Sequence, residues 1–219
     1  MPLPRTKLVG FICVAAGLTL YGTWIGWLST RTERPVDIPI SMAIGHVRTR
    51  EFKINLNALF TIDIEVQKTI PFETLNCLLG TAMGRTSTDL QECPDKPSVV
   101  KASWVLSSNG QIVAQGSSDD YRSGAWMNDA ISRELGHFQS QSGRIYVLDV
   151  NVLADGTALT PGNPRLKVGV HPEVYEDNMV RGFMFLVVTG VSVLVGIILL
   201  GISAKRARQE PPSLPSDKR

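Results

Sequence analysis

Two uninterrupted apolar runs bracket a longer block in which apolar and polar residues alternate. The runs cover residues 8–28 and 183–202, and neither contains a charged side chain. Each is about as long as the ~20 residues that an α-helix needs to cross the hydrocarbon core of a bilayer. The pattern predicts two transmembrane helices, with residues 29–182 forming a folded domain between them.

The first run could instead be the core of a cleaved secretory signal, because Arg5 and Lys7 precede it. It is longer than a usual signal core, and no small-x-small cleavage pattern follows it. Three aromatic residues cluster at its far end, as the interfacial anchors of spanning helices do: Tyr21, Trp24 and Trp27. These features favour a retained membrane anchor.

The basic residues predict an orientation in the membrane. Segments 1–7 and 203–219 carry seven basic and two acidic side chains, whereas the whole chain has a formal net charge of +2. Flanks rich in Lys and Arg stay on the cytoplasmic side, so we expect both termini to be cytoplasmic and the central domain extracytoplasmic. Arg31 and Arg34, just after the first run, favour the opposite orientation, but the basic residues of the termini outweigh them. The chain has no Asn-x-Ser/Thr sequence, the acceptor for N-glycosylation, so among plasma membranes we favour the bacterial inner membrane. The proline-rich tail 203–219 is predicted to be disordered.

A period-two pattern extends over residues 52–66. Every even-numbered position is apolar and polar residues fill the odd positions, with Leu59 as the exception. Such alternation is typical of a β-strand with one buried face and one solvated face. The segment is longer than an ordinary strand, so a bend is expected near residues 55–58.

The remaining apolar segments predict an antiparallel β fold. The Asn109-Gly110 pair predicts a tight hairpin, and helical spacing in 71–79 and 125–135 predicts two short helices that pack on a sheet. About six or seven strands and few helices indicate a sandwich. The predicted class is a mainly β extracytoplasmic domain, an antiparallel β-sandwich with two short helices, between two transmembrane α-helices. Further strands are expected at 38–44, 99–106, 112–114, 145–153 and 166–170.

Cysteine usage fits an oxidising compartment. Cys77 and Cys93 both fall in the central block, where they are predicted to form a disulfide. Two unpaired thiols are the alternative, because sequence alone does not show whether the Cα atoms approach each other. Cys13 lies in the first apolar run, where packing is the expected role. The spacings do not match a redox pair or a zinc site.

Candidate catalytic groups are few. The chain has three histidines, His46, His137 and His171, and none has a close-spaced companion typical of a metal site. Asp63 and Glu65 project from the same face of the predicted strand and could form an acid/base or cation-binding pair. Because carboxylates usually occupy the solvated face of a sheet, we interpret them as solvent-facing residues. No phosphate-binding loop, nucleophile elbow or zinc motif occurs, so no catalytic residue, cofactor or metal is predicted.

Small residues in the apolar runs predict close helix packing. Gly22 and Gly26 are four residues apart in the first run, and Ser192 and Gly196 have the same spacing in the second. The plainer interpretation is that the two helices pair with each other, and the alternative is a contact with another subunit or a second copy. Neither run contains a charged residue or histidine, so an ion path through this chain alone is not expected.

The leading functional hypothesis is a non-catalytic two-pass membrane protein. Its sandwich would bind another membrane or envelope protein, as an assembly, scaffold or accessory subunit. The alternative is a ligand- or carbohydrate-binding sensor that uses Trp104, Tyr121 or Trp126, provided that these aromatic residues are exposed together. An enzyme would require a cleft that combines a carboxylate with one of the histidines. Nucleic-acid binding is not expected, because the central block is net acidic.

Overall fold

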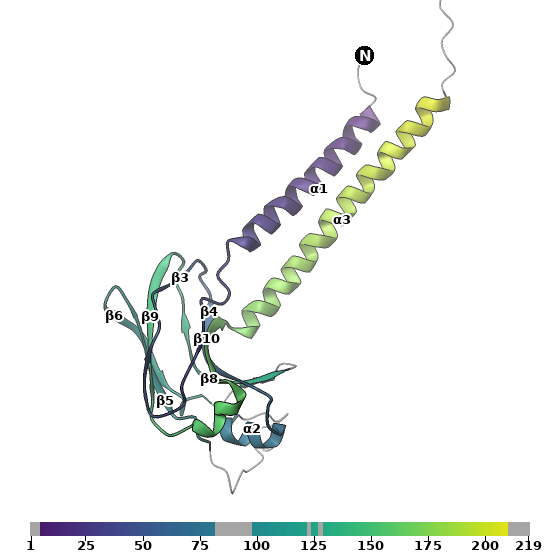
Figure 1. Cartoon of the computed structure of the whole chain (residues 1–219). Helices are drawn as coiled ribbons and strands as arrows, with labels where there is room; N and C mark the ends of the chain where they lie inside the picture. The colour runs from purple at the N-terminus through teal and green to yellow at the C-terminus, as the bar shows by residue number, and fades with distance from the viewer. Residues whose placement is uncertain (1–4, 82–97, 122–123, 127–128, 210–219) are drawn as a thin grey trace, which may run out of the picture. The chain divides into compact units, whose positions relative to one another are not determined.

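The computed structural model describes residues 5–81, 98–121, 124–126 and 129–209 (Figure 1). The chain divides into two compact units, one formed by residues 31–175 and the other by the helices on either side of it. Each unit is described separately.

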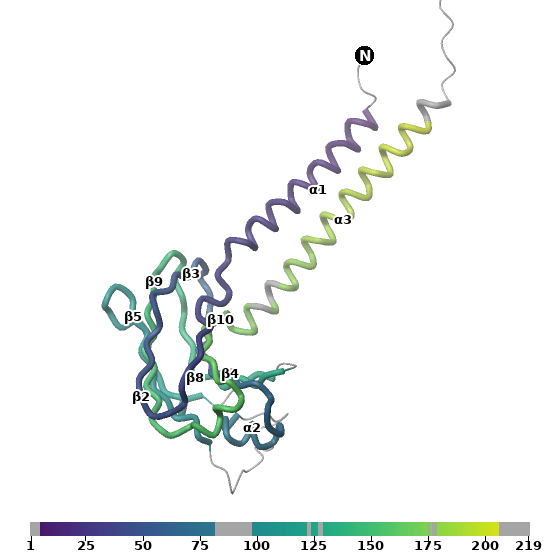
Figure 2. Tube along the Cα trace, in the orientation of Figure 1, coloured from purple at the N-terminus to yellow at the C-terminus, as the bar shows by residue number. Residues whose placement is uncertain are grey.

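Unit 31–175 contains two antiparallel β-sheets, and the path of the chain through them can be followed in Figure 2. The first sheet has the order β1-β10-β4-β8-β7, with β1 Val36–Pro39, β10 Arg165–Val170, β4 Leu59–Gln67, β8 Ala130–Gln139 and β7 Gly124–Trp126. The second sheet has the order β2-β9-β5-β6, with β2 Gly45–Arg48, β9 Arg144–Val152, β5 Ala102–Ser108 and β6 Gln111–Ser117. The short strand β3, Phe52–Ile54, also pairs with β9.

The two sheets contribute to one hydrophobic core. The predicted alternation over 52–66 is confirmed, because the apolar side chains at the even positions are buried apart from the partly buried Leu56. The expected bend near 55–58 separates two strands, β3 beside β9 and β4 in the first sheet. Trp104 from β5 reaches across the core, where its Nε1–H donates to the Leu135 carbonyl oxygen at 2.9 Å. The prediction of antiparallel sheets is therefore confirmed, and the shared core is compatible with a sandwich.

Two local predictions are also confirmed. Asn109 and Gly110 have φ angles of 52° and 76° and join β5 to β6 in a two-residue turn, which is the conformation that an Asn-Gly hairpin favours. Helix α2 spans Phe72–Leu79 and ends at Gly80, whose left-handed conformation lets its N–H reach the last helical carbonyls. A 3-10 helix, η1, spans Thr157–Gly162.

The predicted helix over 125–135 is wrong. Residues 124–126 form β7 and β8 begins at Ala130, while Met127 and Asn128 lie outside the described residues. The apolar spacing that suggested a helix includes Ile131 and Leu135. These two residues are both buried in β8, because residues four apart lie on the same face of a strand as well as of a helix.

The other unit contains helices α1, Arg5–Ser29, and α3, whose full span is Pro172–Gln209. Both are long and apolar enough to cross a membrane. Within this unit the helices lie side by side, and Trp24 stacks on Phe185 with ring centroids 5.0 Å apart (Figure 1). Helix α3 continues beyond the predicted span of 183–202, so the first residues of the predicted tail are helical; residues 210–219 lie outside the described part.

Candidate functional site

The face of the first sheet that points away from the core carries charged side chains in register. Asp37 of β1 lies opposite Lys167 of β10, Lys167 opposite Asp63 of β4, and Asp63 opposite Glu134 of β8. Directly opposed residues in antiparallel strands project to the same face. Four strands therefore place a row of four ionisable groups on this outer face.

A β-bulge brings a histidine to the same face. The register between β4 and β8 shifts at Ile62/Asp63, where Ile62 pairs with Gly136 and Asp63 with Glu134, so Leu135 has no partner across the strands. Residues three apart normally point to opposite faces of a strand, but the extra residue lets Glu134 and His137 share one face. Gly136 is required beside the bulge, because an added Cβ would lie 2.5 Å from Cζ2 of Trp104.

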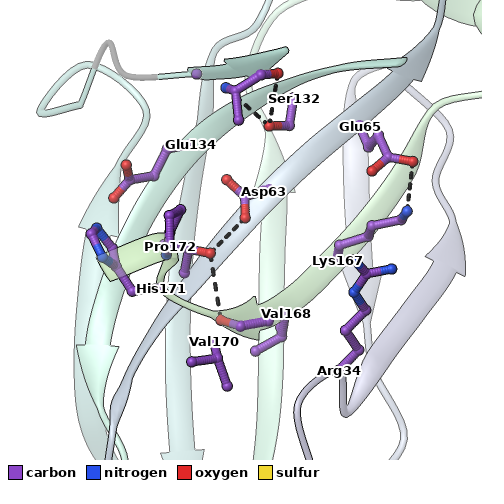
Figure 3. Close-up of a pocket in the computed structure, with 14 residues that line it drawn as sticks. Arg34, Asp63, Glu65, Ser132, Glu134, Lys167, Val168, Val170, His171 and Pro172 are labelled. Atoms are coloured by element: carbon purple, nitrogen blue, oxygen red, sulfur yellow. Dashed lines mark hydrogen bonds and ion pairs between the residues drawn. The ribbon is translucent and has the colours of Figure 1, made fainter. Parts of the chain in front are cut away.

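A pocket of about 240 Å³ opens on this outer face. Its lining comes from β4, β7, β8, β10, the segment before β1 and the start of α3. Figure 3 shows side chains from neighbouring strands projecting over one side of the sheet. The ionisable groups among the lining residues are Arg34, Asp63, Glu65, Glu134, Lys167 and His171.

Asp63 lies at the centre of this group and is half-buried. Its Oδ2 accepts a hydrogen bond from the Thr61 hydroxyl at 2.7 Å. Burial raises the pKa of Asp63 to about 7, and the negative charges of Glu134 and Glu65 add to the rise, while the Thr61 hydrogen bond and Lys167 oppose it. Asp63 thus exchanges a proton near neutral pH, which ordinary surface carboxylates do not.

Glu65 is almost fully buried, and of its two carboxylate oxygens only one has a hydrogen-bond partner among the described residues. It is 9% exposed, and its Oε1 lies 2.5 Å from Nζ of Lys167. The second oxygen, Oε2, is buried without a hydrogen-bond partner among the described residues. An unpaired buried acceptor typically costs about 1–3 kcal/mol, so a donor bound in the pocket would restore a favourable interaction.

Glu134 and two histidines form the other side of the site. A carboxylate oxygen of Glu134 lies 3.0 Å from Nδ1 of His137. The His137 ring meets the Tyr121 ring edge-on at 4.9 Å, and its centroid lies 6.4 Å from that of His171. The pocket and its rim therefore combine carboxylates with imidazoles. Carboxylates and imidazoles are the groups that general acid–base catalysis most often uses, so an enzyme activity would be sought at this site.

The interpretation of Asp63 and Glu65 as solvent-facing residues is wrong. The strand period correctly placed them on one face, but β8, β10 and the segment containing Arg34 surround that face. Glu134 and Lys167 were not recognised from the sequence, because only the strand pairing brings them opposite Asp63. The sequence did contain one indication of the site, because Asp63 and Glu65 are two carboxylates at successive positions on the same face of one strand.

The aromatic residues proposed as a ligand surface do not gather in one place. Trp104 is 2% exposed and belongs to the core, whereas Tyr121 is half-buried beside His137. Trp126 is 67% exposed, with the Phe72 ring 5.5 Å away and the Lys68 Nζ 4.5 Å above its centroid. These three residues therefore do not form a common platform on which a sugar could stack.

Of the small residues predicted to pack between helices, those of α3 contact α1, whereas those of α1 do not contact α3. Within the helical unit, the Ser192 hydroxyl donates to the Cys13 carbonyl oxygen at 3.3 Å, and an added Cβ at Gly196 would lie 2.6 Å from Val14. At Gly22 and Gly26, an added Cβ would meet no atom within 4 Å. The glycines of α1 that face α3 are instead Gly10 and Gly17, which pack against Leu200 and Val193.

The remaining predictions concern cysteines and metals. Of the two cysteines that the structure describes, Cys13 has a free thiol. Cys93 lies outside the described residues, so its disulfide with Cys77 stays a prediction. Within the described ranges, no group of three or more His, Cys, Asp or Glu residues has a geometry that could hold a metal ion.

Comparisons with known proteins identify no family for this chain. No family model matches it, and no curated protein matches it. A solved structure with some similarity is the crystal structure of GEBA250068378 from Sulfurospirillum deleyianum, at 15% sequence identity and a TM-score of 0.44. The match covers 64% of this chain and 99% of that one. The similarity is too low to support an argument about function.

Proposed function

We propose that this chain is a membrane-anchored, non-catalytic binding module whose pocket on the first sheet takes up a small polar ligand. The observation that carries the proposal is the partly satisfied Glu65 carboxylate, buried at the pocket together with Asp63. Burial of a charged group is unfavourable unless it is paired and hydrogen-bonded. Perturbed carboxylates in a concave site are therefore candidates for function.

The size and chemistry of the pocket limit the ligand. A volume of about 240 Å³ is below the ~300–1,000 Å³ that is usual for drug-sized ligands. The ionisable groups of the lining favour a ligand that carries polar or charged groups.

We further propose that helices α1 and α3 anchor the domain with both termini in the cytoplasm, in a bacterial inner membrane. The basic residues that flank the apolar runs support this orientation. The β domain would then lie in an oxidising compartment, where Cys77 and Cys93 can pair. Thiol alkylation of the full chain, before and after reduction, followed by mass spectrometry should show two thiols that become reactive only after reduction. Three reactive thiols before reduction would contradict the pairing.

A test of ligand binding uses a variant that fills the pocket without disturbing the backbone. Gly169 lines the pocket, and an added Cβ would lie 3.7 Å from the nearest atom, the Glu33 carbonyl oxygen. Gly169→Leu should therefore occupy the pocket. Gly45→Leu on β2 is the matched control, because its added Cβ lies 3.9 Å from the nearest atom and outside the pocket.

The full chain in detergent would be screened against small cationic, neutral and anionic compounds by ligand-observed NMR. We expect some compounds to bind the wild type and Gly45→Leu but not Gly169→Leu. Failure of every compound to bind, or equal binding to both variants, would contradict a ligand-binding function for this pocket.

A second candidate function is binding of another membrane or envelope protein through the edge strand β6. Its sequence, QIVAQGS, has no charged residue, and Ile112 is 64% exposed. No strand of the described residues pairs with the outer edge of β6. Open, uncharged edges can accept a strand from a partner or from a second copy. Crosslinking in native membranes, with Ile112→Lys as the disrupting variant, would test this possibility.

A further inference from the structure

We propose that the ligand of the pocket is a small organic cation, with its ammonium or guanidinium group held by the carboxylates of Asp63, Glu65 and Glu134. This inference rests on the proposed ligand-binding function and names the chemical class of the ligand. It is carried by three observations: the opposed carboxylates, the positions of the cations of the protein, and the unpartnered oxygen of Glu65.

The first observation is the pairing of like charges. Asp63 and Glu134 lie directly opposite each other on β4 and β8, and both line the pocket (Figure 3). Like charges at directly opposed positions destabilise a sheet. A cation bound between the two side chains would turn this repulsion into attraction.

The second observation is where the cationic side chains lie. Nζ of Lys167 is 2.5 Å from Glu65 and 3.8 Å from Asp37, so its charge is already shared with two carboxylates. Arg34, the lining residue besides Lys167 that is a lysine or arginine, is exposed. The lining holds three carboxylates against these two cations, and this balance favours a positive ligand.

The third observation is Oε2 of Glu65, which has no hydrogen-bond partner among the described residues. Glu65 is 9% exposed as a residue and 11% exposed in its side chain, and it lines the pocket. An ionised carboxylate only accepts hydrogen bonds, whereas ammonium and guanidinium groups only donate them. A ligand of this class therefore supplies what the site lacks, and a charge-assisted hydrogen bond is stronger than a neutral one.

Two other ligand classes fit less well. The described residues offer no cluster of three or more metal-ligating side chains with suitable geometry, and the carboxylates would repel an anion. Proton exchange at Asp63 agrees with the choice of a cation. Its pKa of about 7 would fall when a positive charge binds nearby, so binding should become tighter as the pH rises.

Isothermal titration calorimetry on the full chain in detergent would test the proposal in an amine-free buffer. The probes are ethanolammonium and methylguanidinium as cations, ethylene glycol as a neutral compound and acetate as an anion. We expect only the cations to bind, with up to roughly tenfold higher affinity at pH 8 than at pH 6, because the ionised fraction of Asp63 rises across that interval.

Substitutions distinguish cation binding in the pocket from a general electrostatic attraction of cations to the protein. Asp63→Asn and Glu134→Gln should each weaken cation binding by roughly tenfold or more, as expected when a charge-assisted hydrogen bond is lost. Asp63→Asn should also remove the pH dependence. The exposed residues Asp119 and Glu51 provide matched controls, and Asp119→Asn and Glu51→Gln should bind as the wild type does.

The possible failures are distinguishable. Binding of acetate or ethylene glycol that is lost in Gly169→Leu would overturn the cation assignment and leave the ligand-binding function intact. Cation binding that is unchanged in both Asp63→Asn and Glu134→Gln would place the cation elsewhere and overturn the assignment too. Absence of any cation binding would also overturn it, and if the compound screen fails as well, the binding function itself is wrong.

Discussion

The two faces of the first sheet both contain buried residues but differ in chemistry. On the core face, the even-numbered residues of β4 are no more than 1% exposed: Phe60, Ile62, Ile64 and Val66. On the outer face, Thr61 is 6% exposed, and Glu65 and Glu134 are each 9% exposed. Strand β4 thus buries apolar groups on one face, while on the other face Glu65 is buried and Asp63 half-buried.

The difference shows that burial alone does not mark a structural core. Dispersion and the hydrophobic effect stabilise the core face and need no particular partner. On the outer face each buried polar group without a partner costs free energy, and one oxygen of Glu65 has no partner among the described residues. The face whose interactions are incomplete is therefore the better candidate for binding a ligand.

The largest effect is expected from Trp104→Ala in the core. The substitution removes a 2% exposed ring and its hydrogen bond to the Leu135 carbonyl, and should lower the free energy of unfolding by about 3–5 kcal/mol. Urea unfolding of the full chain in detergent, followed by near-UV circular dichroism, measures it. Trp126→Ala is the control, because Trp126 is 67% exposed. Equal losses in both variants would show that the core does not depend on Trp104.

A somewhat smaller loss is expected from Lys167→Gln on the outer face. Removal of the ammonium group leaves the Glu65 carboxylate buried without its charged partner. Breaking a buried ion pair in this way should cost about 3 kcal/mol. Lys167→Gln/Glu65→Gln is the informative second variant, because it removes both charges and should recover most of the loss. A double variant no more stable than Lys167→Gln would show that the ion pair itself is not the cause.

Asp63→Asn is expected to stabilise the protein. The pKa of Asp63 is about 7 in the folded protein and 3.8 without the fold. Between these values the folded state holds a proton that the unfolded chain has released, so stability falls as the pH rises through this interval. The full shift corresponds to about 4 kcal/mol, and partial exposure should reduce the gain in Asp63→Asn at pH 8 to about 2 kcal/mol.

The pH dependence gives the Asp63 prediction its control. The same urea titrations at pH 4.5 should show little difference between Asp63→Asn and the wild type, because Asp63 is then protonated in the folded state. The exposed Asp119 provides the matched variant, and Asp119→Asn should have no effect at either pH. A gain for Asp63→Asn of equal size at pH 4.5 and pH 8 would show that titration of Asp63 is not its source.

Much of the fold could be predicted from local patterns. The alternation over 52–66, the Asn109-Gly110 turn and the helix near 71–79 each depend on nearby residues, and the structure contains all three. The helix predicted over 125–135 failed because Ile131 and Leu135, four residues apart, share one face of a strand just as they would share one face of a helix. That spacing alone does not distinguish the two structures, and the pairing of β8 with β4 decides between them.

The site could be predicted only in part for the same reason. The strand period placed Asp63 and Glu65 on one face, but their burial comes from segments distant in the sequence, including Arg34, Glu134 and Lys167. The solvated face was the reasonable prediction for an isolated strand. Recognising the site required the strand order β10-β4-β8, which cannot be read from the local spacing of residues.

The smallest effect is expected from Arg165→Gln, two residues from Lys167 on β10. Nε of Arg165 lies 2.5 Å from Oδ1 of Asp37, but the two side chains are 38% and 41% exposed. Solvent and salt screen such a pair, so its loss should cost about 0–1 kcal/mol and disappear at high ionic strength. The geometry is as close as that of the Lys167–Glu65 pair, so burial is the main difference between them. If Arg165→Gln cost as much as Lys167→Gln, burial would not explain the energetics of the outer face, and the buried Glu65 carboxylate would no longer indicate a bound ligand.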